Sequence, residues 1–381
     1  MTMGFCHISY SHTCLKSPAL SIRKVSSINN HKQTQNRYDR FRLCLKPKTH
    51  DTDPNESVHK LMEVAKSTME VLSSNRRAFN RTWSRMSPLL ELVVSTCSSD
   101  DDEELGFDTT PKTQSTHKLR SIADVGCDHG LLSLSLASMA WSASQTHKEG
   151  KENNVDSVFL SKVTGTDLSP NALNGALLSL DKINKTLSRM PTTVEDDKIT
   201  VSIDFRVGDG LEPLQIGEAD GIILAGMGVH TMIEILTGSN ALDRLGTNHL
   251  FLQPTNSRPR HLLMIYDALQ SNYKWQLMEE AIVFLGGRWY ISSYFRRRQT
   301  NAMETASAQF PGYFLTTKDS DGTRATYNAY VKHHIEWLKQ DYTSRKGALE
   351  PEDVRWLEHF CNEKVYSKWK DACEWYSKDE M

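Results

Sequence analysis

The sequence predicts an α/β fold built on one open, largely parallel sheet of about seven strands. Between residues 118 and 298, short apolar runs alternate with stretches of helical spacing. Several apolar runs end in small and acidic residues, notably 124–130 (DVGCDHG), 208–210 (GDG) and 225–228 (AGMG). Because an open α/β sheet forms its ligand crevice at the carboxyl ends of its strands, these turns are expected to meet at one edge.

The individual elements follow from apolar alternation and from turn residues. Parallel strands are predicted over Leu119–Val125, Val158–Gly165, Ile199–Val207, Gly221–Leu224 and His249–Leu252. Helices are predicted over Leu131–Trp141, Pro170–Leu187, Thr231–Leu236 and Arg260–Leu269. An antiparallel hairpin completes the sheet, and Gly286-Gly287 joins its strands Trp275–Leu285 and Trp289–Phe295.

Composition divides the chain into four parts. We expect a presequence over 1–50, a helical extension with an acidic linker over 51–117, the α/β domain over 118–298 and a helical C-terminal region over 299–381. One or two helices are expected between Val58 and Val94, before the acidic run. Within the domain, residues 142–156 have no periodicity and are expected to form a polar insertion.

The N-terminal segment is basic. Residues 1–50 contain nine Lys and Arg residues against the single acid Asp39, while the whole chain has a net charge of −2. A basic, Ser-rich and acid-poor start is typical of transit peptides, so a plastid or a mitochondrion is the expected location; a basic tail on a cytoplasmic protein is the alternative. No apolar run approaches the ~20 residues that span a bilayer, so no membrane association is expected.

The seven cysteines show no Cys-x-x-Cys pair and no spacing typical of metal ligands. Reduced thiols and the absence of a metal site are therefore expected.

The first turn lacks the Gly-x-Gly-x-x-Gly pattern of dinucleotide enzymes, and no Walker lysine is present. The remaining candidate is a ligand that contains a nucleoside but no phosphates, such as S-adenosylmethionine. Asp167, after the second strand, is placed to accept from ribose hydroxyls, and Asp209, after the third, from an adenine amino group. Gly126 permits close approach of a methionine moiety.

The motifs resemble those of the bacterial TrmK family of tRNA adenine-N1 methyltransferases. The resemblance covers roughly residues 118–298 and rests on 124–129 (DVGCDH), 207–211 (VGDGL), 223–228 (ILAGMG) and 252–254 (LQP) with Asn256 and Arg258. It implies a class I (Rossmann-like) methyltransferase fold, S-adenosylmethionine as cofactor and tRNA as partner. Departures occur at Val229, where the family usually has a second Gly, and after His129.

The resemblance also implies the site residues. Those for the cofactor are Asp124, Gly126, Asp128, Asp167, Leu168, Asp209, Gly210, Ala225, Gly226 and Met227. Those for catalysis are Asp128, His129, Gln253 and Asn256. Asp128 or His129 orients the base, and the two amides bind its edge. Structural roles are the alternatives: a helix cap for His129, local pairing for Asp128 and turn stabilisation for the amides.

RNA binding requires cationic surface, because phosphate contacts dominate affinity. The expected patches are Arg258 and Arg260, the run Arg296, Arg297 and Arg298, and Lys332 and Lys339 in the tail. Tyr327, Tyr330 and Tyr342 are interpreted as the more exposed tail aromatics, able to stack on bases. There are two competing interpretations: a methyltransferase that acts on another RNA or on a small molecule, and a non-catalytic module of the same fold.

Overall fold

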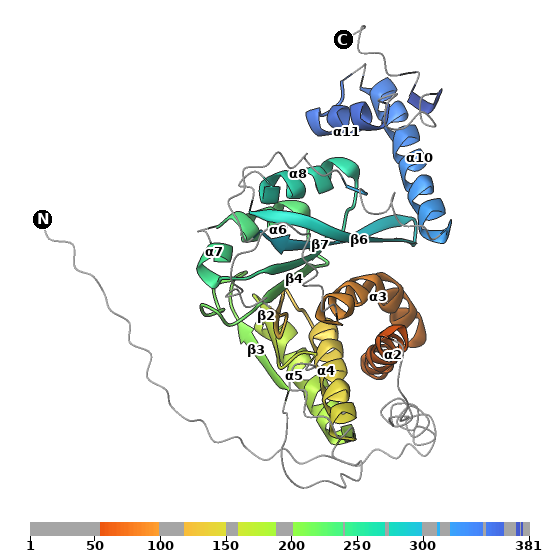
Figure 1. Ribbon diagram of the computed structural model, residues 1–381. Helices are drawn as coiled ribbons and strands as arrows, with labels where there is room; N and C mark the ends of the chain where they lie inside the picture. Colours follow the sequence, from red (N-terminus) through yellow and green to blue (C-terminus); the bar gives the residue numbers. More distant parts are fainter. Residues whose placement is uncertain are drawn as a thin grey trace, which may run out of the picture.

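The computed structural model describes residues 54–98, 118–149, 159–187, 201–238, 241–270, 274–298, 311–312, 321–345, 348–361, 371–373 and 375 (Figure 1). The expected presequence and most of the acidic linker lie outside the described residues. Among the described residues, no helix is both long and apolar enough to cross a membrane.

One seven-stranded sheet organises the chain, in the order β3-β2-β1-β4-β5-β7-β6. The strands are β1 (Ser121–Val125), β2 (Lys162–Asp167), β3 (Ser202–Val207), β4 (Gly221–Ala225), β5 (His249–Gln253), β6 (Trp275–Leu285) and β7 (Arg288–Arg297). The first five are parallel, whereas β7 is antiparallel to both β5 and β6. The predicted α/β class, the strand number and the closing hairpin are confirmed.

Helices cover both faces of this sheet (Figure 1). They are α2 (Pro54–Leu72), α3 (Arg76–Ser98), α4 (Leu131–Glu149), α5 (Pro170–Leu187), α6 (Val229–Thr237), α7 (Ala241–Leu245) and α8 (Pro259–Gln270). Alternate residues of a strand point to opposite faces. Ile122 accordingly belongs to the core beneath α2, α3 and α4, whereas its neighbour Ala123 belongs to the core beneath α6, α7 and α8.

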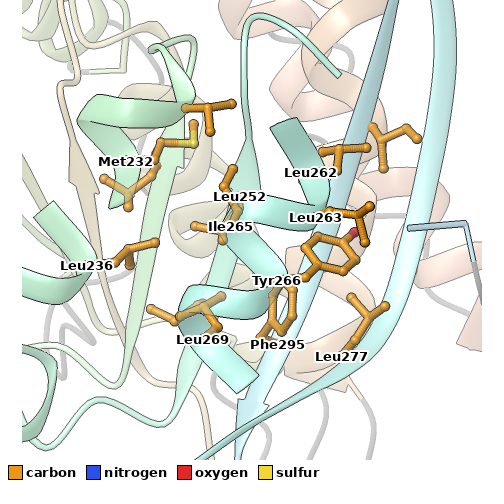
Figure 2. Packing of buried hydrophobic residues seen from close by; sticks show 14 of the residues in the cluster. Met232, Leu236, Leu252, Leu262, Leu263, Ile265, Tyr266, Leu269, Leu277 and Phe295 are labelled. Atoms are coloured by element: carbon orange, nitrogen blue, oxygen red, sulfur yellow. The ribbon is translucent and has the colours of Figure 1, made fainter. Parts of the chain in front are cut away.

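The C-terminal helices α10 (Asp321–Ser344) and α11 (Pro351–Cys361) share the second core. Tyr330 and Trp356 are completely buried within it, in one cluster with residues of α6, α8 and the β6–β7 hairpin. Figure 2 shows part of this cluster, including Met232, Ile265, Tyr266 and Phe295. The tail is therefore packed on the sheet domain and does not stand apart from it.

This packing corrects the interpretation of the tail tyrosines. Tyr327 and Tyr330 are buried and stack on each other, so they cannot stack on a nucleic-acid base. The hydroxyl of Tyr330 donates to the carbonyl oxygen of Ser257 at 2.8 Å. A tyrosine of an amphipathic helix can be buried when its hydroxyl forms a hydrogen bond. The periodicity of one sequence does not show which group accepts that bond.

Other expectations need smaller corrections. Helix α4 continues to Glu149, so the polar stretch 142–149 is helical and only its remainder lies outside the described residues. The second strand begins at Lys162, not Val158, and the short helix α7 was not expected.

Cys373 is disulfide-bonded, against the expectation of reduced thiols, whereas Cys97 and Cys127 are free and buried.

Candidate functional site

The candidate site lies at the carboxyl ends of the parallel strands, where the strand order reverses. From β1 the chain proceeds outward to β2 and β3, and then returns to place β4 on the other side of β1. The loops after β1 and β4 therefore lead to helices on opposite faces of the sheet. Open α/β sheets bind their ligands at such a switch point, and we call the space between these loops the crevice. The predicted motifs 124–130, 208–210 and 225–228 all occupy this edge.

The loop after β1 has a strongly constrained backbone. Gly126 and Gly130 have φ of 73° and 70°, and Asp128 has a φ of 50°, the one positive value among described non-glycine residues. The backbone N–H groups of Gly126 and Cys127 both donate to the carbonyl oxygen of Thr166, at 2.8 and 3.0 Å. This left-handed conformation turns the chain from the strand into α4 and presents Asp128 outward.

Asp167 ends β2 with both carboxylate oxygens held in place. Oδ2 accepts from the backbone N–H of Asp128 at 2.9 Å, and Oδ1 accepts from that of Ser169 at 2.8 Å. The carboxylate is only half-buried, so its remaining lone pairs are available at the crevice. The neighbouring Leu168 exposes 69% of its surface, an apolar area beside a fixed anion.

Asp124 lies deeper than its predicted role suggests. The residue is 2% exposed, and Ser133 Oγ donates to its Oδ2 at 2.6 Å. Burial raises the pKa of the Asp124 carboxyl to about 6, although the hydrogen bond from Ser133 opposes this shift. The carboxyl thus lies beneath the loop and links β1 to the first turns of α4.

The loop after β3 contributes Asp209 and Gly210. The side chain of Asp209 is exposed, and Gly210 has a φ of 49°. The carbonyl oxygen of Gly210 accepts from Thr166 Oγ1 at 3.3 Å. This contact joins β2, one residue before Asp167, to the loop after β3, so Asp209 and Asp167 belong to the same side of the crevice.

Asp128 and His129 lie together at the surface of the crevice. His129 Nε2 is 3.7 Å from Asp128 Oδ1, and both side chains are mostly exposed. The His129 ring lies over α5, where a Cβ added at Gly175 would be 2.5 Å from His129 Nδ1. The structure therefore brings two of the four predicted catalytic residues together, and Gly175 leaves the room that the imidazole occupies.

The loop after β4 forms the opposite wall. Gly226 has a φ of 77°, and its N–H donates to the carbonyl oxygen of Gln253 at 2.9 Å. Ala225, the last residue of β4, is half-buried. The methyl carbon of Met227 lies 2.8 Å from the position that a Cβ would take on Gly126, so Met227 reaches across to the first loop.

The two predicted amides have structural partners. Gln253 is 1% exposed, and its Nε2 donates to the backbone oxygen of Arg85 at 2.8 Å and to Ser292 Oγ at 2.7 Å. Its Oε1 is buried without a hydrogen-bond partner. Asn256 Oδ1 accepts from the backbone N–H of Arg258 at 3.2 Å, which closes a turn.

Arg85, a residue of α3, also lies at this site, although the sequence did not predict it there. A Cβ added at Gly226 would lie 3.8 and 4.0 Å from Arg85 Nη2 and Nη1, so the guanidinium faces the loop after β4. Its Nε is buried without a hydrogen-bond partner. The available signal was the spacing of Arg77, Arg81 and Arg85 at intervals of four, in a helix interpreted only from its apolar stripe.

The predicted RNA-binding residues lie in different places. Arg258 stacks over the Trp337 ring at 4.4 Å, and Arg260 Nη1 is 3.5 Å from Asp353 Oδ2, so both join the sheet domain to the tail. Lys332 and Lys339 are exposed on α10.

The run Arg296, Arg297 and Arg298 lies at the opposite edge of the sheet. Arg296 pairs in register with His249, the first residue of β5, whereas the crevice lies at the last. Arg297 forms an ion pair with Asp243. The run therefore does not adjoin the candidate site.

Among the described residues, no group of three or more His, Cys, Asp and Glu side chains is placed to hold a metal ion.

Comparison with known proteins agrees with this architecture. Residues 165–291 match a family model described as a methyltransferase domain. The match covers less than half of the chain; it begins within β2 and ends within β7, and it includes Asp167, Asp209 and Gly226. No curated protein matches the sequence. The strand order, the antiparallel hairpin and this match identify a Rossmann-like methyltransferase fold.

Similar solved structures were also found. An uncharacterized protein from Listeria monocytogenes serotype 4b has 18% sequence identity and a TM-score of 0.41, with 67% of this chain and 90% of that chain covered. The B. subtilis m1A22 tRNA methyltransferase TrmK has 19% identity and a TM-score of 0.38, with 67% and 89% covered. M. capricolum TrmK, in complex with S-adenosyl-homocysteine, has 17% identity and a TM-score of 0.40, with 66% and 92% covered.

Proposed function

We propose that this protein transfers the methyl group of S-adenosylmethionine to N1 of an adenine in tRNA. The observation that carries the proposal is the convergence, at one edge of the sheet, of the loops that contain Asp128, Asp167 and Gly226. The matched methyltransferase domain supports methyl transfer. The motif resemblance to the TrmK family supports adenine in tRNA as the acceptor.

The crevice residues fit the methyl donor. Asp167 is oriented by two backbone N–H groups and would accept from the ribose hydroxyls, with Leu168 against the adenine. The exposed Asp209 would accept from the adenine amino group. The left-handed Gly126 and Gly226 leave backbone uncovered on the two walls. When bound, S-adenosylmethionine would supply an electrophilic methyl group on its sulfonium sulfur.

The chain's part in the reaction is alignment. Adenine N1 is a neutral lone pair, so no proton must leave before the N–CH₃ bond forms and the C–S bond breaks. The ring becomes cationic as it gains the methyl group. The Asp128 carboxylate, exposed at the crevice beside His129, would orient the base through its N6 amine and stabilise that positive charge.

The direct test is to incubate the purified full chain with methyl-labelled S-adenosylmethionine and organellar tRNA. Digestion to nucleosides should then show labelled N1-methyladenosine. Label in another nucleoside would overturn the choice of adenine N1. Label only in small-molecule fractions would overturn RNA as the acceptor, and donor binding without any transfer would indicate a non-catalytic module.

We extend the proposal to location. The nine basic residues and single acid of residues 1–50 favour import into a plastid or a mitochondrion. A fluorescent reporter fused to residues 1–50 should enter one of these organelles, and a reporter that remains in the cytoplasm would contradict this part of the proposal.

A further inference from the structure

The first half of α3 carries a row of arginines on one face. Arg77, Arg81 and Arg85 are spaced by four residues, so they lie along one side of the helix. Arg77 and Arg81 are exposed, and Arg85 is half-buried. We call these three residues the arginine row.

The arginine row is not explained by the stability of α3. Positive charge in the first turns of a helix opposes the macrodipole, and the first turn of α3 contains no acidic residue. The helix begins with a different device, because Asn75 Oδ1 accepts from the backbone N–H of Ala78 at 2.9 Å. Within the described part of the chain, none of the three arginines forms an ion pair with a carboxylate.

The row ends at the candidate site. The guanidinium of Arg85 faces Gly226 on the wall formed by the loop after β4. The backbone oxygen of Arg85 is held by Gln253 Nε2, so the position of this turn of α3 is fixed to the end of β5. Two buried polar atoms at this junction, Arg85 Nε and Gln253 Oε1, have no hydrogen-bond partner.

We infer that the arginine row binds the sugar–phosphate backbone of the RNA substrate, with Arg85 holding the phosphate next to the nucleotide that is methylated. This inference rests on the proposed function. Arginine suits the role, because its planar guanidinium can bind a phosphate through two parallel hydrogen bonds. A row of such groups that ends beside the reacting base would also fix its register without reading sequence.

The other candidate patches are less suited to this task. Arg258 and Arg260 contact Trp337 and Asp353, and the run at Arg296 lies at the opposite edge of the sheet. By contrast, the arginine row has no carboxylate partner among the described residues, and Arg85 at its end faces the loop after β4.

The experiment compares four purified full-length variants with the wild type. Arg77→Ala/Arg81→Ala removes the exposed part of the row. Arg85→Ala and Arg85→Lys test the end of the row, since lysine keeps the charge but not the planar fork. The matched control is Arg120→Ala/Lys185→Ala, which removes two exposed positive charges near the opposite edge of the sheet.

Binding of tRNA is measured by fluorescence anisotropy over a range of salt concentrations, and donor binding by calorimetry. Arg77→Ala/Arg81→Ala should weaken tRNA binding about tenfold or more. It should also lower the slope of log K against log salt by roughly 1.4–1.8, the value for two lost phosphate contacts. Donor affinity should be unchanged. The control variant should match the wild type in both measurements.

Arg85 should behave differently, because it lies at the reacting nucleotide. Arg85→Ala should lower kcat at saturating tRNA, and Arg85→Lys should restore the salt slope but not kcat. Wild-type tRNA affinity and salt slope in Arg77→Ala/Arg81→Ala would overturn the inference while leaving the proposed function in place. A wild-type protein that neither binds nor methylates RNA would overturn both.

Discussion

The backbone N–H of Asp128 donates to Asp167 Oδ2 at 2.9 Å, which ties the loop after β1 to the end of β2. Asp128 has a left-handed backbone at this point, with a φ of 50°. One residue proposed for catalysis thus orients the carboxylate proposed to bind the donor. Substitutions in this pair should separate their roles.

Asp167→Ala should weaken S-adenosylmethionine binding by roughly 1–3 kcal/mol, because the charge-assisted hydrogen bonds to ribose are lost. Asp167→Glu, which keeps the carboxylate, should recover part of the affinity. Titration calorimetry on the purified chain measures both. A folded Asp167→Ala variant with wild-type affinity would show that the ribose is bound elsewhere.

Asp128→Gly and Asp128→Ala both remove the carboxylate, but only glycine adopts a positive φ without strain. The alanine variant should therefore be less stable than the glycine variant by about 1 kcal/mol, as measured by urea unfolding. The two should lose methyl transfer to tRNA to the same extent. Full activity in the glycine variant would remove Asp128 from the proposed mechanism.

Asp124 should make stability depend on pH. Its folded pKa of about 6 lies above the ordinary value of 3.8, so the folded state keeps a proton that the unfolded state has lost between these values. Stability should fall as pH rises through this window. Relative to Asp124→Asn, the wild type should lose on the order of 2–3 kcal/mol between pH 4 and pH 7.

The measurement for Asp124 is urea unfolding of both proteins at each pH. Ser133→Ala removes the hydrogen bond that favours the ionised carboxyl, so it should extend the loss of stability to higher pH. A difference between wild type and Asp124→Asn that does not change with pH would contradict the raised pKa.

Trp356→Ala should destabilise the whole protein and not the tail alone. Trp356 is completely buried in the core shared by α8, α10 and α11, so its loss should cost about 3–5 kcal/mol. Unfolding should be monitored both by circular dichroism and by donor binding. The Trp356→Ala variant should shift the two transitions by the same amount. Two separate transitions, with donor binding retained after the first, would instead show that the tail unfolds independently.

How much the sequence predicted varies along the chain. The apolar runs and their small, acidic ends predicted the α/β class, the order of the elements and the loops that carry Asp128, Asp167 and Gly226, because strand and helix periodicity are local properties. The same reasoning placed Tyr327 and Tyr330 at the surface, where the structure buries them. It also chose the arginines at 296–298, which lie away from the crevice.

The sequence by itself determined what each segment could form and which loops could bind a ligand. The tertiary structure decided which side chains meet. Local patterns do not encode that Gln253 binds the backbone of Arg85, 168 residues earlier, or that Arg260 faces Asp353. Such contacts depend on how whole helices pack on the sheet, which is set by burial of apolar surface summed over the domain. For this reason the spacing of the arginines could suggest a basic helix face, but only the fold places Arg85 beside Gly226.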